Sequence, residues 1–237
     1  TGFPWGAKAI ALLCQKAENQ WVGVNTGIMD QMISAVGQAG RAVLIDCRSL
    51  DLAPAPLPEG TVVVIPDTHT RRELVTSAYN ERRAQCEAAA AHFGVRVLRD
   101  VTLDQLNAAQ AALDPVVFRR ARHIVSENAR TVEAKHAMDA GDAAELGRLM
   151  RGSHTSLRDD FEVTNAALNA IVAIADAQPG WFGARMTGAG CGGCAGARVR
   201  EDAAQSFSEA VSAAYTAETG LNPAIYVTGA TDGASLL

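Results

Sequence analysis

The stretch that decides the fold is Arg185-Met-Thr-Gly-Ala-Gly-Cys-Gly-Gly-Cys194. Its glycines at 188, 190 and 193 match the G-x-G-x-x-G pattern of dinucleotide-binding proteins, but that fingerprint needs a strand before it and a helix after it. Here we expect a second strand directly after the glycines, which disfavours dinucleotide binding. Consecutive glycines let the backbone closely approach either a ligand or another backbone segment. The stretch therefore predicts a tight turn between two strands, and both kinds of close contact stay open.

Outward from this turn, long helical patterns alternate with a few separated strands. Thr102-x-x-Gln105 is a capping box, and Asp114-Pro115 supplies an N-cap followed by a proline at the first helical position. A further capping box, Thr70-x-x-Glu73, precedes a long helix. The patterns predict strands over residues 41–47, 62–65, 184–187, 194–199 and 224–228. They predict further helices over residues 7–20, 27–36, 116–140, 143–150, 166–177 and 202–218. This order is typical of an α+β protein rather than of a regular βαβ array.

The best domain boundary is the proline-rich segment Leu52–Gly60. Pro54, Pro56 and Pro58 disfavour both a helix and a central strand, so the segment is interpreted as a linker.

The composition is that of an ordinary globular protein. The chain has 237 residues. Its formal net charge of −5 argues against nucleic-acid binding. The basic cluster Arg119, Arg120, Arg122 and His123 is interpreted as a solvated helix face. No apolar run approaches the roughly 20 residues of a membrane span, and the first residues carry no signal-peptide pattern. We therefore expect a cytoplasmic protein that binds neither nucleic acid nor membranes.

Five cysteines, an odd number set mostly in apolar segments, fit reduced, buried thiols better than a disulfide framework. Cys191 and Cys194 form a CxxC, but a zinc ribbon would need a second pair, and a redox motif would begin a helix. The histidines show no ligand-pair spacing. We expect no metal site in this chain.

Two further residues have ordinary structural explanations when each is considered alone. Asp30 lies in the first turn of an expected helix, where the helix dipole favours a carboxylate. Tyr79 precedes Arg82 and Arg83 by three and four residues, which is typical of a surface hydrogen-bonding cluster on a helix.

Several strings taken together change that reading, because in order and spacing they closely resemble the galactokinases of the GHMP family of small-molecule kinases. The resemblance covers essentially the whole chain. It rests on Gly27-Ile-Met-Asp30-Gln31, Ala42-Val-Leu-Ile-Asp-Cys-Arg-Ser-Leu50, Tyr79-Asn-Glu-Arg-Arg83-x-x-Cys86-Glu87, Phe118-Arg-Arg-Ala-Arg-His123, Ser153-His154-x-x-Leu157-Arg-Asp-Asp-Phe161 and the glycine stretch itself.

The resemblance implies transfer of the ATP γ-phosphoryl group to the anomeric hydroxyl of α-D-galactose, which gives galactose 1-phosphate and ADP. ATP and Mg²⁺ are the implied cofactors, galactose and ATP the implied partners, and a monomer is favoured. Two alternatives stay open, an N-acetylgalactosamine kinase and a non-catalytic galactokinase-like sugar sensor.

The same resemblance implies the site residues. Asp30 would be the catalytic aspartate and would contact the sugar, as would Tyr79 and the backbone of Gly27. Gly188, Gly190, Gly192 and Gly193 would form the loop that shapes the nucleotide and sugar clefts, although Cys191 stands where an aromatic residue is usual.

The implied fold has two domains. Residues 1–56 would be part of a ribosomal-S5-like N-terminal domain, and residues 57–237 a ferredoxin-like domain enlarged by helices, with the last residues, 229–237, returning toward the first domain. The family's sugar-contacting signature and its phosphate-cradling loop, with the magnesium ligands, would precede Thr1. We therefore expect this chain alone to be inactive. Asp67-Thr-His-Thr70 departs from the Asn-rich pattern of the family, so no contact is assigned there.

Overall fold

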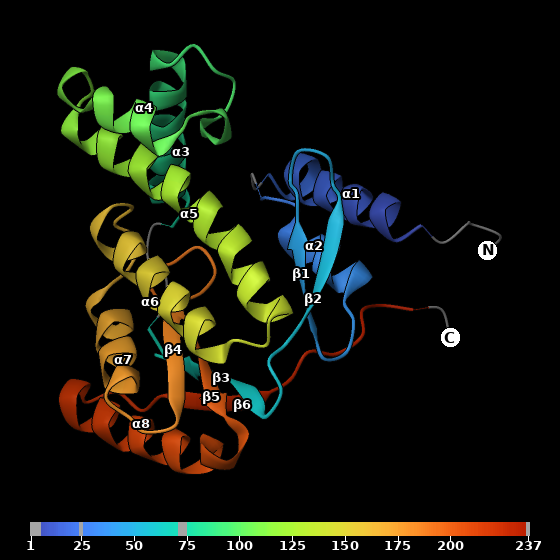
Figure 1. Cartoon of the computed structure of the whole chain (residues 1–237), viewed down its shortest axis with the longest axis vertical. Coiled ribbons are helices and arrows are strands. Elements are labelled where there is room, and N and C mark those ends of the chain that lie inside the picture. Colours follow the sequence, from blue (N-terminus) through green and yellow to red (C-terminus); the bar gives the residue numbers. More distant parts are fainter. Residues whose placement is uncertain (1–5, 24–25, 71–74, 236–237) are drawn as a thin grey trace. The chain divides into compact units, whose positions relative to one another are not determined.

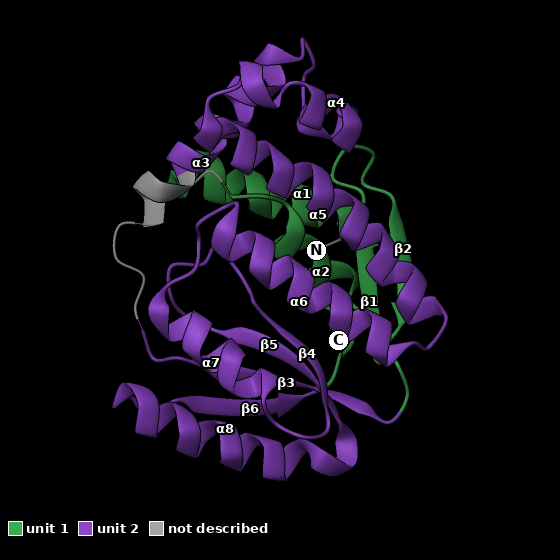
Figure 2. Cartoon of the chain, turned by 60° about the vertical axis from the view of Figure 1, so that its left-hand side comes forward, with its two compact units in different colours: residues 1–59, 229–237 green, residues 60–228 purple. Residues whose placement is uncertain are grey.

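The computed structural model of the chain describes residues 6–23, 26–70 and 75–235. The chain divides into two compact units, shown in different colours in Figure 2: unit 1 comprises residues 1–59 and 229–237, and unit 2 comprises residues 60–228. The domain division over residues 1–56 and 57–237 stays a prediction, because compactness by itself does not define a domain.

Unit 1 consists of helices, a two-stranded sheet and the C-terminal segment. Its buried apolar cluster is formed by Ala11, Ile28 and Met32. Its elements are α1 (Ala7–Ala17), which continues into a π-helical turn (Glu18–Val22), α2 (Met29–Val36), β1 (Arg41–Ile45) and β2 (Leu52–Pro56).

The C-terminal segment returns to the first part of the chain, as predicted. The amide of Gly40 donates to the carbonyl of Ala230 at 3.1 Å, and the amide of Gly233 donates to the carbonyl of Gly37 at 2.9 Å. Residues 229–235 therefore belong to unit 1 although they end the sequence.

The interpretation of Leu52–Gly60 as a linker is wrong for its first half, because β2 pairs antiparallel with β1. Leu57 donates its amide to the carbonyl of Gly40. Residues an even number of positions from Leu57 therefore direct their backbone N–H and C=O groups toward β1. Pro54 and Pro56 alternate with these residues and face the free edge, where a missing N–H costs no ladder hydrogen bond.

Unit 2 is built on a four-stranded antiparallel sheet with the order β4-β5-β3-β6 (Figure 1). Counted along the chain, the strand order is second, third, first, fourth, which is the ferredoxin-like arrangement expected from the resemblance. The strands are β3 (Thr61–Asp67), β4 (Trp181–Met186), β5 (Ala195–Arg200) and β6 (Ala224–Thr228).

Six α-helices accompany the sheet in the described part of unit 2. They are α3 (Val75–His92), α4 (Leu103–Ala108), α5 (Pro115–Asp139), α6 (Ala143–Asp159), α7 (Ala166–Asp176) and α8 (Ala204–Thr219), with short 3₁₀ turns at Leu98–Asp100, Gln110–Ala112 and Glu201–Ala203. Both capping predictions at 102 and 114 are confirmed. Helix α6 extends nine residues beyond its predicted end at 150. The predicted capping box at 70–73 reaches outside the described residues.

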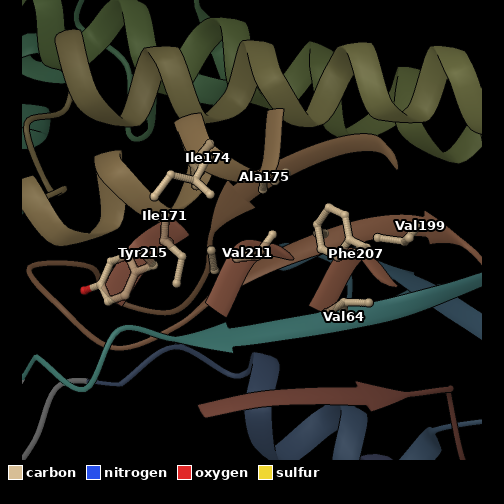
Figure 3. Packing of buried hydrophobic residues seen from close by; sticks show 12 residues of the cluster. Val64, Ile171, Ile174, Ala175, Val199, Phe207, Val211 and Tyr215 are labelled. Carbon is tan, nitrogen blue, oxygen red and sulfur yellow. The ribbon is translucent and has the colours of Figure 1, made fainter. Parts of the chain in front are cut away.

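The main core lies between one face of the sheet and helices α7 and α8 (Figure 3). Val64 and Val199 from the sheet pack with Ile171 of α7 and with Phe207 and Val211 of α8. A second cluster joins α3, α4 and α5 around Leu106 and Phe118. None of the described helices is long and apolar enough to cross a membrane.

Candidate functional site

Asp30 lies in the first turn of α2 and is exposed. The helix begins without a side-chain cap, so its first amides are not satisfied by a capping side chain. Among the described residues, no donor or cation contacts the Asp30 carboxyl group. An exposed carboxyl at a helix N-terminus can accept a hydrogen bond or a proton from a hydroxyl ligand.

A cluster of polar side chains holds the segment that carries Asp30. Glu18 Oε2 accepts hydrogen bonds from Gln31 Nε2 at 2.5 Å and from Thr26 Oγ1 at 3.1 Å. The Thr26 amide donates to Asn19 Oδ1 at 3.0 Å. Thr26 and Gln31 bracket residues 27–30, so the π-helical turn ties down both ends of this segment.

These positioning residues are not predicted by any local pattern in the sequence. Glu18 and Asn19 lie in a π-helical turn, a geometry that is rare and often found at functional sites, and the helical pattern over 7–20 gives no sign of it.

Gly27 is exposed, and a Cβ added to it would meet nothing within 4 Å. No described neighbour requires a glycine here. Its backbone is open to a ligand, as the predicted sugar contact requires.

The glycine loop, residues 187–194, is a tight turn between β4 and β5, as predicted. Thr187 donates its amide to the carbonyl of Cys194 at 3.1 Å and so closes the hairpin. Gly188, Gly190, Cys191, Gly192 and Gly193 all have positive φ. The loop thus uses backbone conformations that most side chains rarely adopt.

Gly190 is glycine because another backbone segment occupies the space beside it. A Cβ added there would lie 2.0 Å from the carbonyl oxygen of Val163, which also accepts the amide of Cys191 at 2.7 Å. By contrast, Gly188 and Ala189 are exposed, and their amides donate to no acceptor within the described part of the chain. These two amides are the ones that the loop offers to a ligand.

The end of β3 holds the other side of the loop. Gly193 donates its amide to the carbonyl of Thr70 at 3.1 Å, and its own carbonyl accepts both the amide and the hydroxyl of Thr68. Thr68 is fully buried, and its carbonyl accepts the hydroxyl of Tyr215 at 3.1 Å. The segment to which no family contact could be assigned therefore supports the glycine loop.

Backbone strain gathers around this loop. Outside glycine, positive φ occurs at four described residues, and three of them, His69, Glu162 and Cys191, lie in the loop or next to a residue that hydrogen-bonds to it. Strained residues persist where surrounding contacts hold them, and they cluster at functional sites.

Two buried histidines contact residues in the segments that adjoin the glycine loop. His154 Nδ1 accepts the amide of Met186 at 3.2 Å, so its neutral ring carries the proton on Nε2, and burial lowers its pKa to about 4. His123 stacks on Phe161 with ring centroids 4.5 Å apart, its Nδ1 lies 3.0 Å from Ser156 Oγ, and burial lowers its pKa to about 4 as well. Both rings serve as neutral packing and hydrogen-bonding groups.

The interpretation of the basic cluster as a solvated face is wrong for two of its residues, since Arg120 and His123 are 2% and 4% exposed. Arg120 is paired with Glu162 and hydrogen-bonded to Gln85, and both partners come from distant sequence. The surface cluster expected around Tyr79 is likewise corrected for Arg82, whose side chain is 13% exposed.

Tyr79 belongs to helix α3, but its side chain lies outside the described residues. Gly27 and Asp30 lie in unit 1, whereas Tyr79 and the glycine loop lie in unit 2.

The described residues contain no group of three His, Cys, Asp or Glu side chains that could hold a metal ion. Within the described residues none of the five cysteines forms a disulfide. Cys14 and Cys47 are exposed rather than buried as expected, whereas Cys86, Cys191 and Cys194 are half-buried.

Comparison with known proteins relates both units to one group of enzymes. Residues 134–217 match the family described as GHMP kinases C terminal. The chain is 46% identical over 235 residues to a galactokinase of Actinobacillus succinogenes, an alignment that covers 98% of the chain and 61% of that protein.

Solved structures agree. The crystal structure of Lactococcus lactis galactokinase complexed with galactose matches 99% of the chain and 62% of its own length, with 35% identity and a TM-score of 0.94. The L. major mevalonate kinase in complex with R-mevalonate matches 98% of the chain and 60% of its own length at 16% identity with a TM-score of 0.60, which shows a shared fold. The chain thus spans about three fifths of the length of these relatives.

Proposed function

Because the chain belongs to the GHMP kinase family and matches galactokinase along 98% of its length, we propose that it takes part in galactokinase activity. The reaction is transfer of the γ-phosphoryl group of ATP to the anomeric hydroxyl of α-D-galactose, with galactose 1-phosphate and ADP as products. Support for galactose comes from the similarity to the L. lactis enzyme, whose crystal structure contains that sugar.

The observation that carries the proposal is the placement of Asp30. Its carboxyl group is exposed at the start of α2, and the Glu18–Thr26–Gln31 contacts hold the segment that presents it. An exposed carboxyl group on a segment that is held at both ends suits a sugar hydroxyl as its partner.

Two chemically distinct roles are open to Asp30. As a general base it takes the proton from the anomeric hydroxyl as the phosphoryl group arrives. As an orienting group it only aligns that hydroxyl for in-line attack, which suffices if the transition state is loose and deprotonation is late. In either role Gly27 offers its backbone, and Tyr79 its phenol, to the other sugar hydroxyls.

ATP supplies the phosphoryl group, and the glycine loop is the part of this chain that we assign to it. The exposed amides of Gly188 and Ala189 fit an anionic or polar group of the nucleotide, whereas Gly190 and Gly193 shape the loop through contacts with other backbone segments. Mg²⁺ is the expected companion of ATP, but the described residues do not by themselves form a site for it.

We further propose a cytoplasmic monomer that binds galactose and ATP and binds neither nucleic acid nor membranes. A kinase needs the ATP of the cytoplasm, and a net charge of −5 does not favour nucleic acid.

The decisive experiment uses a protein that spans the full length of the galactokinase relatives, because this chain covers 61% of one of them and is expected to be inactive alone. It measures ADP release with galactose, with N-acetylgalactosamine and without sugar, and identifies the product by ³¹P NMR. Galactose-dependent release is expected, and Asp30→Asn should lower kcat by roughly 10²–10⁴ while sugar binding persists. A loss of about tenfold or less would favour the orienting role. Asp104→Asn is the matched control, because Asp104 also lies exposed in a helix first turn, that of α4.

Sugar binding without turnover in the unsubstituted protein would overturn the proposal in favour of a sugar sensor. Faster turnover of N-acetylgalactosamine than of galactose would reassign the substrate.

A further inference from the structure

Residues 160–163 begin the connection between α6 and α7 and touch the glycine loop directly. The carbonyl of Val163 accepts the amide of Cys191 at 2.7 Å, and the same oxygen fills the space beside Gly190. The position of this one carbonyl thus determines where the middle of the glycine loop can lie.

The segment is held in an unfavourable conformation. Glu162, the residue before Val163, has a φ of +54°, a region that bulky L-residues rarely adopt. Such a conformation persists only when surrounding contacts impose it.

Two arginines impose it by binding the carbonyls that precede Val163. Arg82 of α3 donates from Nε to the carbonyl of Phe161 at 2.6 Å and from a terminal nitrogen to the carbonyl of Glu162 at 3.2 Å. Arg120 of α5 donates to the carbonyl of Asp160 at 2.5 Å and to Glu162 Oε2 at 2.6 Å. Three consecutive carbonyls are therefore taken by guanidinium groups, and the fourth is left for the glycine loop.

We propose that Arg82 and Arg120 are positioning residues for the glycine loop, because they hold residues 160–163 in the strained conformation that presents the Val163 carbonyl to Cys191. A guanidinium group has five donors in a rigid fork and can bind two carbonyls at once, which an ammonium group does less well. Arg120 is almost fully buried, so its contacts with the segment are desolvated and specific. Any consequence for phosphoryl transfer rests on the proposed function, but the positioning itself does not.

The test is local hydrogen exchange in the folded protein. Arg82→Met removes both carbonyl contacts from a side chain that is 13% exposed. The amide of Cys191 should then exchange at least about tenfold faster, which corresponds to the loss of one to two hydrogen bonds, while the amides of β5 change by less than about twofold. Arg82→Lys should give an intermediate rate, because it keeps the charge without the fork.

Arg148→Met is the matched control, since Arg148 on α6 makes an exposed ion pair with Glu145 and should leave the Cys191 amide unchanged. An unchanged Cys191 rate in Arg82→Met, or equal acceleration in β5, overturns the proposal, because the second result means general destabilisation. If Arg82→Met does not fold, the same comparison on Arg82→Lys decides.

A kinetic readout links the loop to the reaction. In the active kinase, Arg82→Met should lower kcat/KM for galactose phosphorylation about tenfold, Arg82→Lys should recover part of the loss, and Arg148→Met should match the parent. An absence of turnover in the parent refutes the proposed function, whereas the exchange experiment still decides the positioning proposal.

Discussion

Gly147 of α6 and Gly183 of β4 meet backbone to backbone: a Cβ added to Gly183 would lie 2.2 Å from the carbonyl oxygen of Gly147. Ala184, the next residue of β4, belongs to the core under α7 and α8. Since neighbouring residues of a strand point to opposite faces, α6 packs on the other side of β4. The helix that carries His154 is thereby held directly against the strand that leads into the glycine loop.

Gly183→Ala should destabilise unit 2 by about 2–3 kcal/mol, because the added methyl group forces backbone apart rather than a flexible side chain. Urea unfolding followed by circular dichroism measures this. Gly196→Ala is the matched control on the neighbouring strand, where an added Cβ meets nothing within 4 Å, and it should change stability by less than about 1 kcal/mol. Equal effects of the two substitutions would contradict the close approach.

Gly190→Ala should distort the glycine loop beyond the ordinary cost of a left-handed alanine. That cost is about 1–2 kcal/mol, and the clash with the Val163 carbonyl adds to it. Gly220→Ala separates the two contributions, because Gly220 also has positive φ but has open space around it. We expect a larger loss of stability in Gly190→Ala than in Gly220→Ala, with faster amide exchange at Cys191 in Gly190→Ala alone. An equal loss of stability in the two variants would mean that the Val163 carbonyl moves aside without any cost in free energy.

Mild acid should destabilise the protein through His123 and His154. In the unfolded chain a histidine takes up a proton near pH 6.5, whereas burial lowers the folded pKa of each ring to about 4. The unfolded state therefore binds more protons between these pH values, so stability is full above about pH 6.5 and falls as the pH decreases toward 4. From pH 7 to pH 5 the loss should be roughly 2 kcal/mol for each histidine.

Urea unfolding at pH 7, 6 and 5 measures this loss. His154→Gln should be less stable than the parent at pH 7 but should show a smaller pH dependence. His136→Gln serves as the control, since His136 is exposed. A parent stability that does not change between pH 7 and 5 would show that these rings are protonated in the folded protein.

Cys86 should resist alkylation in the folded protein. Burial raises the pKa of its thiol to about 11, although Arg120 and Arg82 act in the opposite direction. Only about 0.1% of such a thiol is ionised at pH 8, and the thiolate is the reactive form. Iodoacetamide labelling followed by peptide mapping should modify exposed Cys47 roughly 100-fold faster than Cys86.

Labelling in urea supplies the control, because unfolding removes the protection and should bring the two rates together. Comparable labelling rates for Cys47 and Cys86 in the folded state would show that the Cys86 thiol on α3 is not buried.

Local sequence signals predicted much of the fold. The caps at Thr102 and Asp114 act within three residues of themselves, so their side chains suffice to start α4 and α5. Asp30 and the glycine loop could be proposed as site residues because the resemblance to galactokinases is carried by strings of consecutive residues. The π-helical turn at Glu18 was missed, since nothing in its helical pattern distinguishes it.

Burial was the least predictable property of the polar residues. Arg120 resembles a solvated helix residue when only its neighbours in sequence are considered. Its actual partners, the carbonyl of Asp160 and the carboxylate of Glu162, lie 40 and 42 residues away. A pairing of this kind depends on how α5 packs beside the end of α6, which no local period encodes.

By itself, the sequence determined the kinds and order of most elements, with β2 and the π-helical turn as exceptions, together with the ferredoxin-like expectation for the larger unit and the similarity to galactokinases. Periodicity, caps and motif strings are properties of neighbouring residues. Only the tertiary structure decided why Gly190 is a glycine, which arginines are buried and what holds the glycine loop. The physical reason is that these features arise where segments far apart in the chain meet, and the contacts of Val163 with Cys191 and of Thr68 with Gly193 exist only after the sheet and its helices have packed.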